Sequence, residues 1–294
     1  MMKRVVSVSL GTSQRDHTAS IRIFGEDVHI ERLGMDGDLE RARRTIQDLD
    51  GKVDAIGLGG IDRYLVVNQI RYEIRDARYL VDAASQTPVV DGSGLKDTWE
   101  RWVVEDQIAK GVLRPAMTVL MVSALDRFGM AETFYRYGFS VLAGDLIFGS
   151  HINYPIESLD ELIELGRKLL PEMVKLPFTQ LYPTGALQTA APDDRYYEYF
   201  SNTDIIAGDF HFIRRYAPEK LDQKVIVTNT TTELDRDELR GRGVREIVTT
   251  TPVIAGRTFG TNVMEALLVA VTDILPWDEA WSEVVQKARI ELAG

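Results

Sequence analysis

The sequence predicts an α/β protein with an N-terminal α/β domain and a C-terminal Rossmann-like domain built on a doubly wound parallel sheet. Two observations favour this class. From about residue 113, short apolar runs alternate with helix-length segments, which is typical of parallel strands joined by crossover helices. Before that residue, alternating runs around glycines indicate hairpins. We therefore expect domains at 1–112 and 113–275, followed by a segment 276–294 whose helix packs back on one of them.

In the first half, strict alternation predicts a strand at 4–11 and a hairpin at 18–34. A continuous apolar run that ends in glycines predicts a strand at 53–60, buried on both faces. The remaining elements expected there are a helix at 38–49, a hairpin about Asn68, a helix at 75–84, a strand at 87–91 and a helix at 95–111.

In the second half, Ser158 and Glu161 form a capping-box pattern before an amphipathic helix. The strands expected in this half lie at 118–123, 140–145, 203–209, 224–229 and 245–251, with a further one at 179–185. The expected helices lie at 129–137, 159–173, 196–201, 233–242, 261–272 and 278–292.

The composition limits the classes of function. Hydrophobic residues make up 45% of the chain and charged residues 27%, as in ordinary globular proteins. No apolar run reaches the roughly 20 residues that span a bilayer, and the first residues do not resemble a signal peptide. We therefore expect a cytoplasmic protein without a membrane partner. The absence of cysteine excludes disulfides and thiolate catalysis, and four histidines leave little room for a metal site.

The charge of the chain limits its partners. The formal net charge is −11, which argues against nucleic acid because phosphate contacts need a basic face. We expect a small-molecule substrate, and a homodimer is left open.

Polar side chains end every strand predicted in the second half. Each alone could cap a helix or form a turn. Their coincidence at one edge of the sheet favours a ligand site, because open α/β sheets bind ligands at the carboxyl ends of their strands. The candidate cofactor-binding residues are Ser123, Asp126, Arg127, Gly129, Asp145, Thr228, Asn229 and Thr250.

The turn after the strand at 118–123 is the usual phosphate cradle. Of a G-x-G-x-x-G pattern only the last glycine, Gly129, is present, and Asp126 stands where glycine belongs. A carboxylate there repels a pyrophosphate, and Arg127 partly offsets its charge. Asp145 ends the next strand, where an acidic residue binds the ribose 2′-hydroxyl and favours NAD over NADP.

Two further segments carry candidate catalytic groups. In GDFHFIRRY, Asp209 and His211 form a candidate general base, and Arg214 suits a substrate carboxylate. The alternative is an ordinary helix start with solvated arginines. In DGSGLKDT, Lys96 and Asp91 could converge as a proton-transfer pair, although a solvated charge pair is equally consistent with this pattern. Candidate substrate contacts elsewhere are Tyr182 and Asn262.

Several motifs together carry a resemblance that covers nearly the whole chain. DAIGLGGIDRYL, TPVVDGSGLKDT, VLMVSALDRFGMAE, GDLIFG, AGDFHFIRRY and TTTPVIAGRTFGTN resemble bacterial quinate 5-dehydrogenases of the shikimate/quinate dehydrogenase type. The resemblance implies a substrate domain, a Rossmann domain and a final helix that returns to the first domain. It also implies a catalytic lysine in a strand-following loop and an aspartate well downstream of it.

The leading hypothesis is an oxidoreductase that uses NAD or NADP and acts on a small hydroxylated carboxylate of the quinate or shikimate type. Lys96 and Asp91 would handle the hydroxyl proton, and Arg214 the carboxylate. An S-adenosylmethionine-dependent transferase or lyase is the alternative, because this cofactor carries no phosphate for Asp126 to repel. A ligand-binding sensor without catalysis is a third hypothesis.

Overall fold

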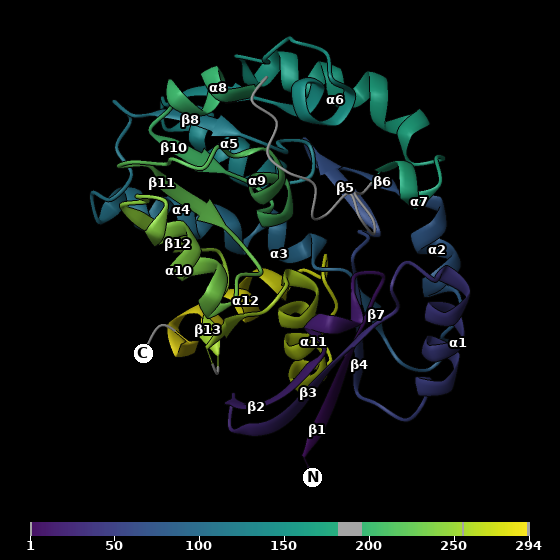
Figure 1. Ribbon diagram of the computed structural model, residues 1–294. Coiled ribbons are helices and arrows are strands. Elements are labelled where there is room, and N and C mark those ends of the chain that lie inside the picture. The colour runs from purple at the N-terminus through teal and green to yellow at the C-terminus, as the bar shows by residue number, and fades with distance from the viewer. Residues whose placement is uncertain (1, 182–195, 255, 293–294) are drawn as a thin grey trace.

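The protein contains two five-stranded sheets, flanked by helices, and two small two-stranded sheets among the residues that the structure describes. The structure is a computed structural model that describes residues 2–181, 196–254 and 256–292 (Figure 1). The predicted α/β class, with an N-terminal α/β part and a C-terminal Rossmann-like sheet, is confirmed. No helix within these residues is both long and apolar enough to cross a membrane.

The first sheet has the strand order β2-β3-β1-β4-β7. Its central strand β1 (Lys3–Ser9) pairs in parallel with β3 (Glu26–Gly34) and with β4 (Ala55–Gly59). At one edge β2 (His17–Ile23) runs antiparallel to β3, and at the other edge β7 (Val89–Val90) is parallel to β4. Four of these strands, β3, β1, β4 and β7, therefore end at the same edge of the sheet.

Alternation along β1 explains why helices cover both faces of this sheet. Val6 and Val8 belong to the core cluster that includes α1 (Leu39–Leu49), whereas Val5 belongs to the cluster that includes α11 (Thr261–Thr272). Beside α1 lies α2 (Arg75–Val81), and beside α11 lies α12 (Trp281–Leu292), which also contacts β2.

The position of α11 differs from the prediction. The range 113–275 assigned this helix to the second domain, but it packs against β1 and β4 of the first sheet (Figure 1). Nine of its residues are buried, so its sequence is apolar on nearly all sides and its pattern does not reveal which sheet it covers.

The second sheet is entirely parallel and has the order β12-β11-β10-β8-β9. Numbered along the chain this is 2-1-3-4-5, one of the two common doubly wound orders. The order reverses at β8, so the switch point lies between β8 and β10. These strands are β8 (Thr118–Met121), β9 (Ser140–Ala143), β10 (Ile205–Ala207), β11 (Val225–Thr228) and β12 (Glu246–Thr249).

Other elements connect the sheets or cover them. The hairpin predicted about Asn68 is formed by β5 (Tyr64–Val67) and β6 (Ile70–Glu73). A second short hairpin consists of β13 (Val253–Ile254) and β14 (Arg257–Thr258). The remaining helices are η1 (Ser13–Arg15), α3 (Ser93–Asp97), α4 (Trp99–Ala109), α5 (Phe128–Arg136), η2 (Asp145–Gly149), α6 (Leu159–Met173), α7 (Phe178–Leu181), α8 (Tyr197–Ser201), α9 (Phe210–Tyr216) and α10 (Glu233–Gly241).

The strand predicted at 179–185 is not formed in its described part. Helix α7 occupies Phe178–Leu181 instead, and the residues from 182 onward lie outside the described ranges. Asp76 of α2 accepts a hydrogen bond from the Phe178 backbone N–H at 2.9 Å, and the Phe178 side chain is buried. This tertiary cap accounts for a helical turn where the local sequence favoured a strand.

Candidate active site

The carboxyl ends of both sheets face one cleft with a volume of about 890 Å³, which is the size of a typical small-molecule site. From the first sheet, the ends of β1, β4 and β7 contribute Ser9, Gly60 and Asp91 to its lining. From the second sheet, the residues that follow β8 and β10 contribute Asp126 and Asp209. The cleft thus includes the switch point of the doubly wound sheet.

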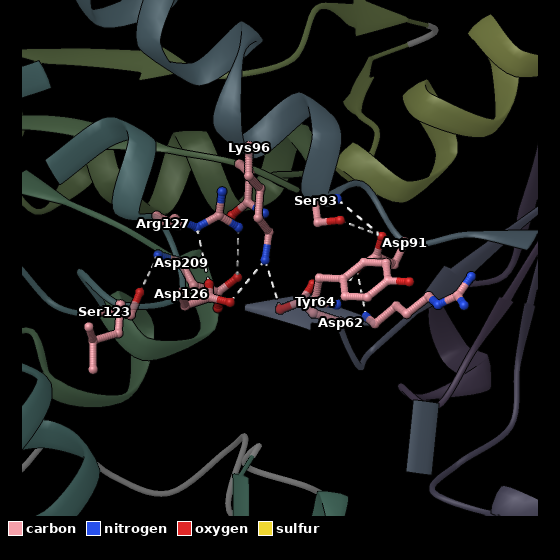
Figure 2. A network of polar contacts seen from close by, with 12 residues as sticks. Asp62, Tyr64, Asp91, Ser93, Lys96, Ser123, Asp126, Arg127 and Asp209 are labelled. Carbon is pink, nitrogen blue, oxygen red and sulfur yellow. Dashed lines mark hydrogen bonds and ion pairs between the residues drawn. The ribbon is translucent and has the colours of Figure 1, made fainter. Parts of the chain in front are cut away.

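Lys96 lies at the centre of the lining, on the short helix α3. Its Nζ is 2.8 Å from Asp62 Oδ2 and 2.9 Å from Asp126 Oδ1 (Figure 2). Asp62 follows β4, Lys96 follows β7 and Asp126 follows β8, so the two sheets build this cluster together. We call Asp62, Lys96 and Asp126 the lysine–carboxylate cluster.

The predicted partner of Lys96 was wrong. Asp91 accepts hydrogen bonds from the backbone N–H groups of Arg63 and Tyr64 at 2.6 and 3.1 Å, and from the Ser93 hydroxyl at 2.8 Å (Figure 2). It therefore holds two loops together and does not pair with Lys96. Asp62 was not among the predicted site residues. Its position just after the buried run GLGG, at the end of a strand, is the sequence feature that indicates a site residue.

The three groups of the lysine–carboxylate cluster hold their protons differently. Burial raises the pKa of Asp62 well above its usual range; Lys96 acts to lower it, and Asp126 acts to raise it. Burial also acts to raise the pKa of Asp126, but Lys96, a hydrogen bond with Asp62 and the charge of Arg127 together outweigh it and hold the pKa low. For Lys96, burial acts to lower the pKa, and its two carboxylate partners raise it further than that. Asp62 therefore takes up a proton more readily than Asp126, and Lys96 stays an ammonium ion near neutral pH.

Arg127 is fully buried beside this cluster and is not placed to bind a phosphate. Its guanidinium forms an ion pair with the buried Glu100 of α4 and lies 3.5 Å from Asp209 Oδ2. Thr250, another predicted cofactor residue, donates its hydroxyl hydrogen to Glu100 at 3.4 Å. These residues hold α4 against the second sheet.

Asp145 closes the loop that follows β8. Its two oxygens accept hydrogen bonds from the backbone N–H groups of Ala124 and Leu125 at 3.1 and 2.8 Å. Burial raises the pKa of Asp145 to about 6, although these amides act to lower it. The carboxylate predicted to bind a ribose is thus engaged by backbone amides of the loop after β8.

The first turn of α5, the helix that follows this loop, is covered by another part of the chain. A Cβ added at Gly129 in the first turn of α5 would lie 2.6 Å from the Lys96 carbonyl oxygen, so α3 covers this turn. Two loop amides are occupied by Asp145, and Asp126 carries negative charge at the loop's edge. A pyrophosphate, which needs free amides at this point, does not fit here.

Three further predicted cofactor residues support the turn after β10. Ser123 Oγ accepts a hydrogen bond from the Asp209 backbone N–H at 3.3 Å. Thr228 donates its hydroxyl hydrogen to the Gly208 carbonyl at 2.8 Å, and Asn229 Oδ1 accepts from the Phe210 N–H at 3.3 Å. Thr228 is fully buried, whereas Ser123 and Asn229 line the cleft.

Asp209 and His211 do not form the predicted pair of side chains. Asp209 caps α9, with Oδ1 accepting from the His211 backbone N–H at 2.9 Å. The His211 ring lies against the first half of the chain, with Nε2 3.2 Å from Arg15 Nη1. Because arginine only donates, His211 Nε2 accepts and the ring proton is on Nδ1. Burial lowers the pKa of His211, and Arg15 adds to this, while Asp209 opposes it.

The predicted substrate-binding residues are spread around the cleft. Arg214 lines it and is 45% exposed, with loose ion pairs to Asp235 at 3.5 Å and Glu238 at 3.8 Å. Asn262 lines it too and donates a hydrogen bond to Ser7 Oγ at 3.0 Å. Tyr182 lies outside the described residues. No group of three or more acidic or histidine side chains suited to a metal ion occurs in the described part of the chain.

Two family models match this chain. The model of the domain of unknown function DUF8753 matches residues 4–91, and that of the domain of unknown function DUF8754 matches residues 94–292. The second match covers more than half of the chain. The chain belongs to the DUF8754 family. Among curated proteins no match is found.

Solved structures with similar folds are distant. Glutamate dehydrogenase from Thermus thermophilus is 13% identical with a TM-score of 0.43, over 92% of this chain and 66% of that one. The chain thus spans slightly less than two thirds of that enzyme. Shikimate 5-dehydrogenase from Thermus thermophilus, in complex with shikimate, is 12% identical with a TM-score of 0.36, over all of both chains. The same values for a galactofuranose binding protein are 10% and 0.36, again over all of both chains. The fold assignment of this DUF8754 member therefore rests on its own topology.

Proposed function

We propose that this DUF8754 member is an enzyme that binds a small hydroxylated carboxylate in the cleft and transfers a proton at one of its hydroxyl groups. The observation that carries the proposal is the position of Lys96 Nζ between the carboxyls of Asp62 and Asp126, where strands of both sheets end. Groups with pKa values pushed apart at one point are the usual basis of acid–base catalysis.

The three side chains suit complementary roles toward a hydroxyl group. The carboxylate of Asp126 is the most exposed of the three and can accept the hydroxyl proton. The ammonium of Lys96 donates a hydrogen bond that stabilises the resulting oxyanion. Asp62, whose pKa burial raises, holds a proton more readily than Asp126 and helps to position the Lys96 ammonium with its hydrogen bond. The spacing of Lys96 and Asp126 along the chain supports the resemblance, which implies a lysine and an aspartate well downstream of it.

Functions that depend on NAD, NADP or S-adenosylmethionine have less support from the geometry of the site. Oxidation with NAD or NADP needs a pyrophosphate site, and the loop after β8 is closed by Asp145 and by α3. S-adenosylmethionine needs no phosphate site, but it would need the Asp145 carboxylate for its ribose. We therefore propose a proton transfer without a nucleotide, in which the hydroxyl proton passes to Asp126 and Lys96 stabilises the oxyanion that remains.

Calorimetric titration of the purified protein tests this proposal. Quinate, shikimate and other hydroxylated carboxylates, and NADH, NADPH and S-adenosylmethionine, are titrated separately. We expect saturable binding of at least one hydroxylated carboxylate and none of the nucleotides. Lys96→Met should abolish that binding, and the control Lys168→Met, which removes an exposed lysine of α6, should leave it unchanged. Saturable binding of NADH or NADPH would instead support the dehydrogenase, and binding unaffected by Lys96→Met would refute the role of the cluster.

A further inference from the structure

A buried glutamate, Glu265, contacts the turn that carries Lys96 into the cleft. Glu265 lies in the middle of α11 and is completely shielded from solvent. Its Oε1 accepts a hydrogen bond from the Gly92 N–H at 2.8 Å, and its Oε2 accepts one from the Leu95 N–H at 3.0 Å. Both amides belong to the first turn of α3, so a residue far along the chain satisfies the start of this helix.

The turn is shaped closely around α11. A Cβ at Gly94 would lie 2.8 Å from Glu265 Oε2, and one at Gly92 would lie 2.5 Å from the Asn262 backbone nitrogen. Gly92 also has a φ of +92°, which side chains other than glycine rarely adopt. The turn can therefore approach α11 this closely only with glycine at both positions.

The same helix packs against the strand that precedes Asp62. Helix α11 contacts β4, and Asp62 follows β4 after a short glycine turn. The Glu265 contact therefore ties α3 to the part of the first sheet that also places Asp62. We propose that Glu265 is a positioning residue, which fixes α3 so that Lys96 Nζ stays between Asp62 and Asp126.

A carboxylate suits this task better than its amide. It offers two acceptor oxygens to two N–H groups; burial raises the pKa of Glu265 well above its usual range, and these hydrogen bonds act to lower it. Glutamine has a single acceptor oxygen, so its NH₂ group would face one of the two amides. Glu265→Gln should loosen the turn and release Lys96 from its carboxylate partners. The significance of this for catalysis rests on the proposed function, but the position of Lys96 can be measured without a substrate.

Competitive acetylation of the whole protein with acetic anhydride measures the state of Lys96. Only the neutral amine reacts, so labelling from about pH 7 to about pH 11, quantified by mass spectrometry, follows the pKa and access of each lysine. In the unmutated protein we expect Lys96 to react at least about tenfold more slowly than the exposed Lys168, which serves as internal standard. In Glu265→Gln, Lys96 labelling should rise about tenfold and its midpoint should move to lower pH.

The control variant is Asp76→Asn. Asp76 is also a buried carboxylate that accepts a backbone N–H, but it lies on α2, away from α3. It should leave Lys96 labelling unchanged. An unchanged Lys96 profile in folded Glu265→Gln, or an equal change in Asp76→Asn, overturns the inference.

A second variant protects the test against misfolding. If Glu265→Gln does not fold, Gly94→Ala displaces the same carboxylate without removing it, and the same two outcomes decide. A result in which Lys96→Met leaves ligand binding intact would overturn the proposed function, and the Glu265 inference would stand or fall separately on the labelling.

Discussion

At the residue scale, the two aspartates around Lys96 have pKa values shifted in opposite directions although both contact the same ammonium group. Asp62 is the more deeply buried carboxyl, and burial favours its neutral form. Asp126 lies closer to Arg127, which favours its charged form. This difference separates their roles and makes them distinguishable by mutation.

We expect Asp126→Asn to reduce turnover at least about 100-fold, because it removes the group that accepts the hydroxyl proton. Asp62→Asn replaces the carboxyl that holds a proton more readily and should cost about tenfold or less. Steady-state kinetics with the ligand identified by titration measures both. Equal losses in the two variants would contradict the different roles of the two aspartates.

Asp145 makes the stability of the fold depend on pH. Its folded pKa of about 6 lies above the ordinary value of 3.8, so the folded state binds the proton more tightly than the unfolded state. The free energy of unfolding should therefore decrease as the pH rises from about 4 to about 6, by at most about 3 kcal/mol. Urea denaturation of the unmutated protein and of Asp145→Asn across this range measures the effect. A difference between the two proteins that does not vary with pH would contradict it.

At the scale of elements, periodicity and turn residues predict most strands and helices, because each element buries one face or both. The strands of the second sheet lie close to their predicted ranges, and so do α1, α6 and α10. The contacts between elements are not predictable in this way. Lys96 meets Asp62, 34 residues before it, and Asp126, 30 residues after it, and only the packed sheets bring them together.

In the candidate site too, the positions of residues at strand ends are predictable from the sequence, whereas their contacts are not. The strand-end rule put Asp126 and Asp209 at one edge of the second sheet, and both line the cleft; that Lys96 of the first half lines the same cleft was not predicted. It could not show that Asp91 and Asp145 use their oxygens on neighbouring backbone amides, because such bonds depend on loop geometry.

The packing of α5 on α3 leads to a prediction at this scale. Gly129→Ala brings a Cβ to 2.6 Å from the Lys96 carbonyl oxygen, so the two helices must separate. We expect a loss of about 1–3 kcal/mol in the free energy of unfolding, measured by denaturant titration. Gly241→Ala is the matched control, since its Cβ at the end of α10 would meet no atom within 4 Å. A loss in Gly129→Ala no larger than that in the control would contradict this packing.

At the scale of the whole molecule, the cleft is formed by two sheets whose carboxyl ends face each other. The helices α3, α4 and α5 pack together, and α3 contributes Lys96 to the cleft lining. At another point, Arg15 of the first half contacts two residues of the second half, with Nη1 3.2 Å from His211 Nε2 and Nη2 3.2 Å from Asp235 Oδ2. These contacts across the cleft help to hold the two sheets at their present separation.

Arg15→Gln should therefore allow the cleft to open. We expect a larger radius of gyration in small-angle X-ray scattering, with the secondary structure unchanged by circular dichroism. The control is Arg22→Gln, which removes an exposed ion pair of β2 far from His211. Identical scattering from the Arg15 variant and the control would show that the contacts do not restrain the cleft.

The most direct test of the central claim is a crystal structure with the best-binding hydroxylated carboxylate, soaked together with NAD. The account predicts a ligand hydroxyl within hydrogen-bonding distance, about 3.2 Å or less, of both Lys96 Nζ and Asp126, and no dinucleotide on the loop after β8. A ligand that leaves the lysine–carboxylate cluster untouched, or a pyrophosphate bound to the Ala124 and Leu125 amides, would contradict it.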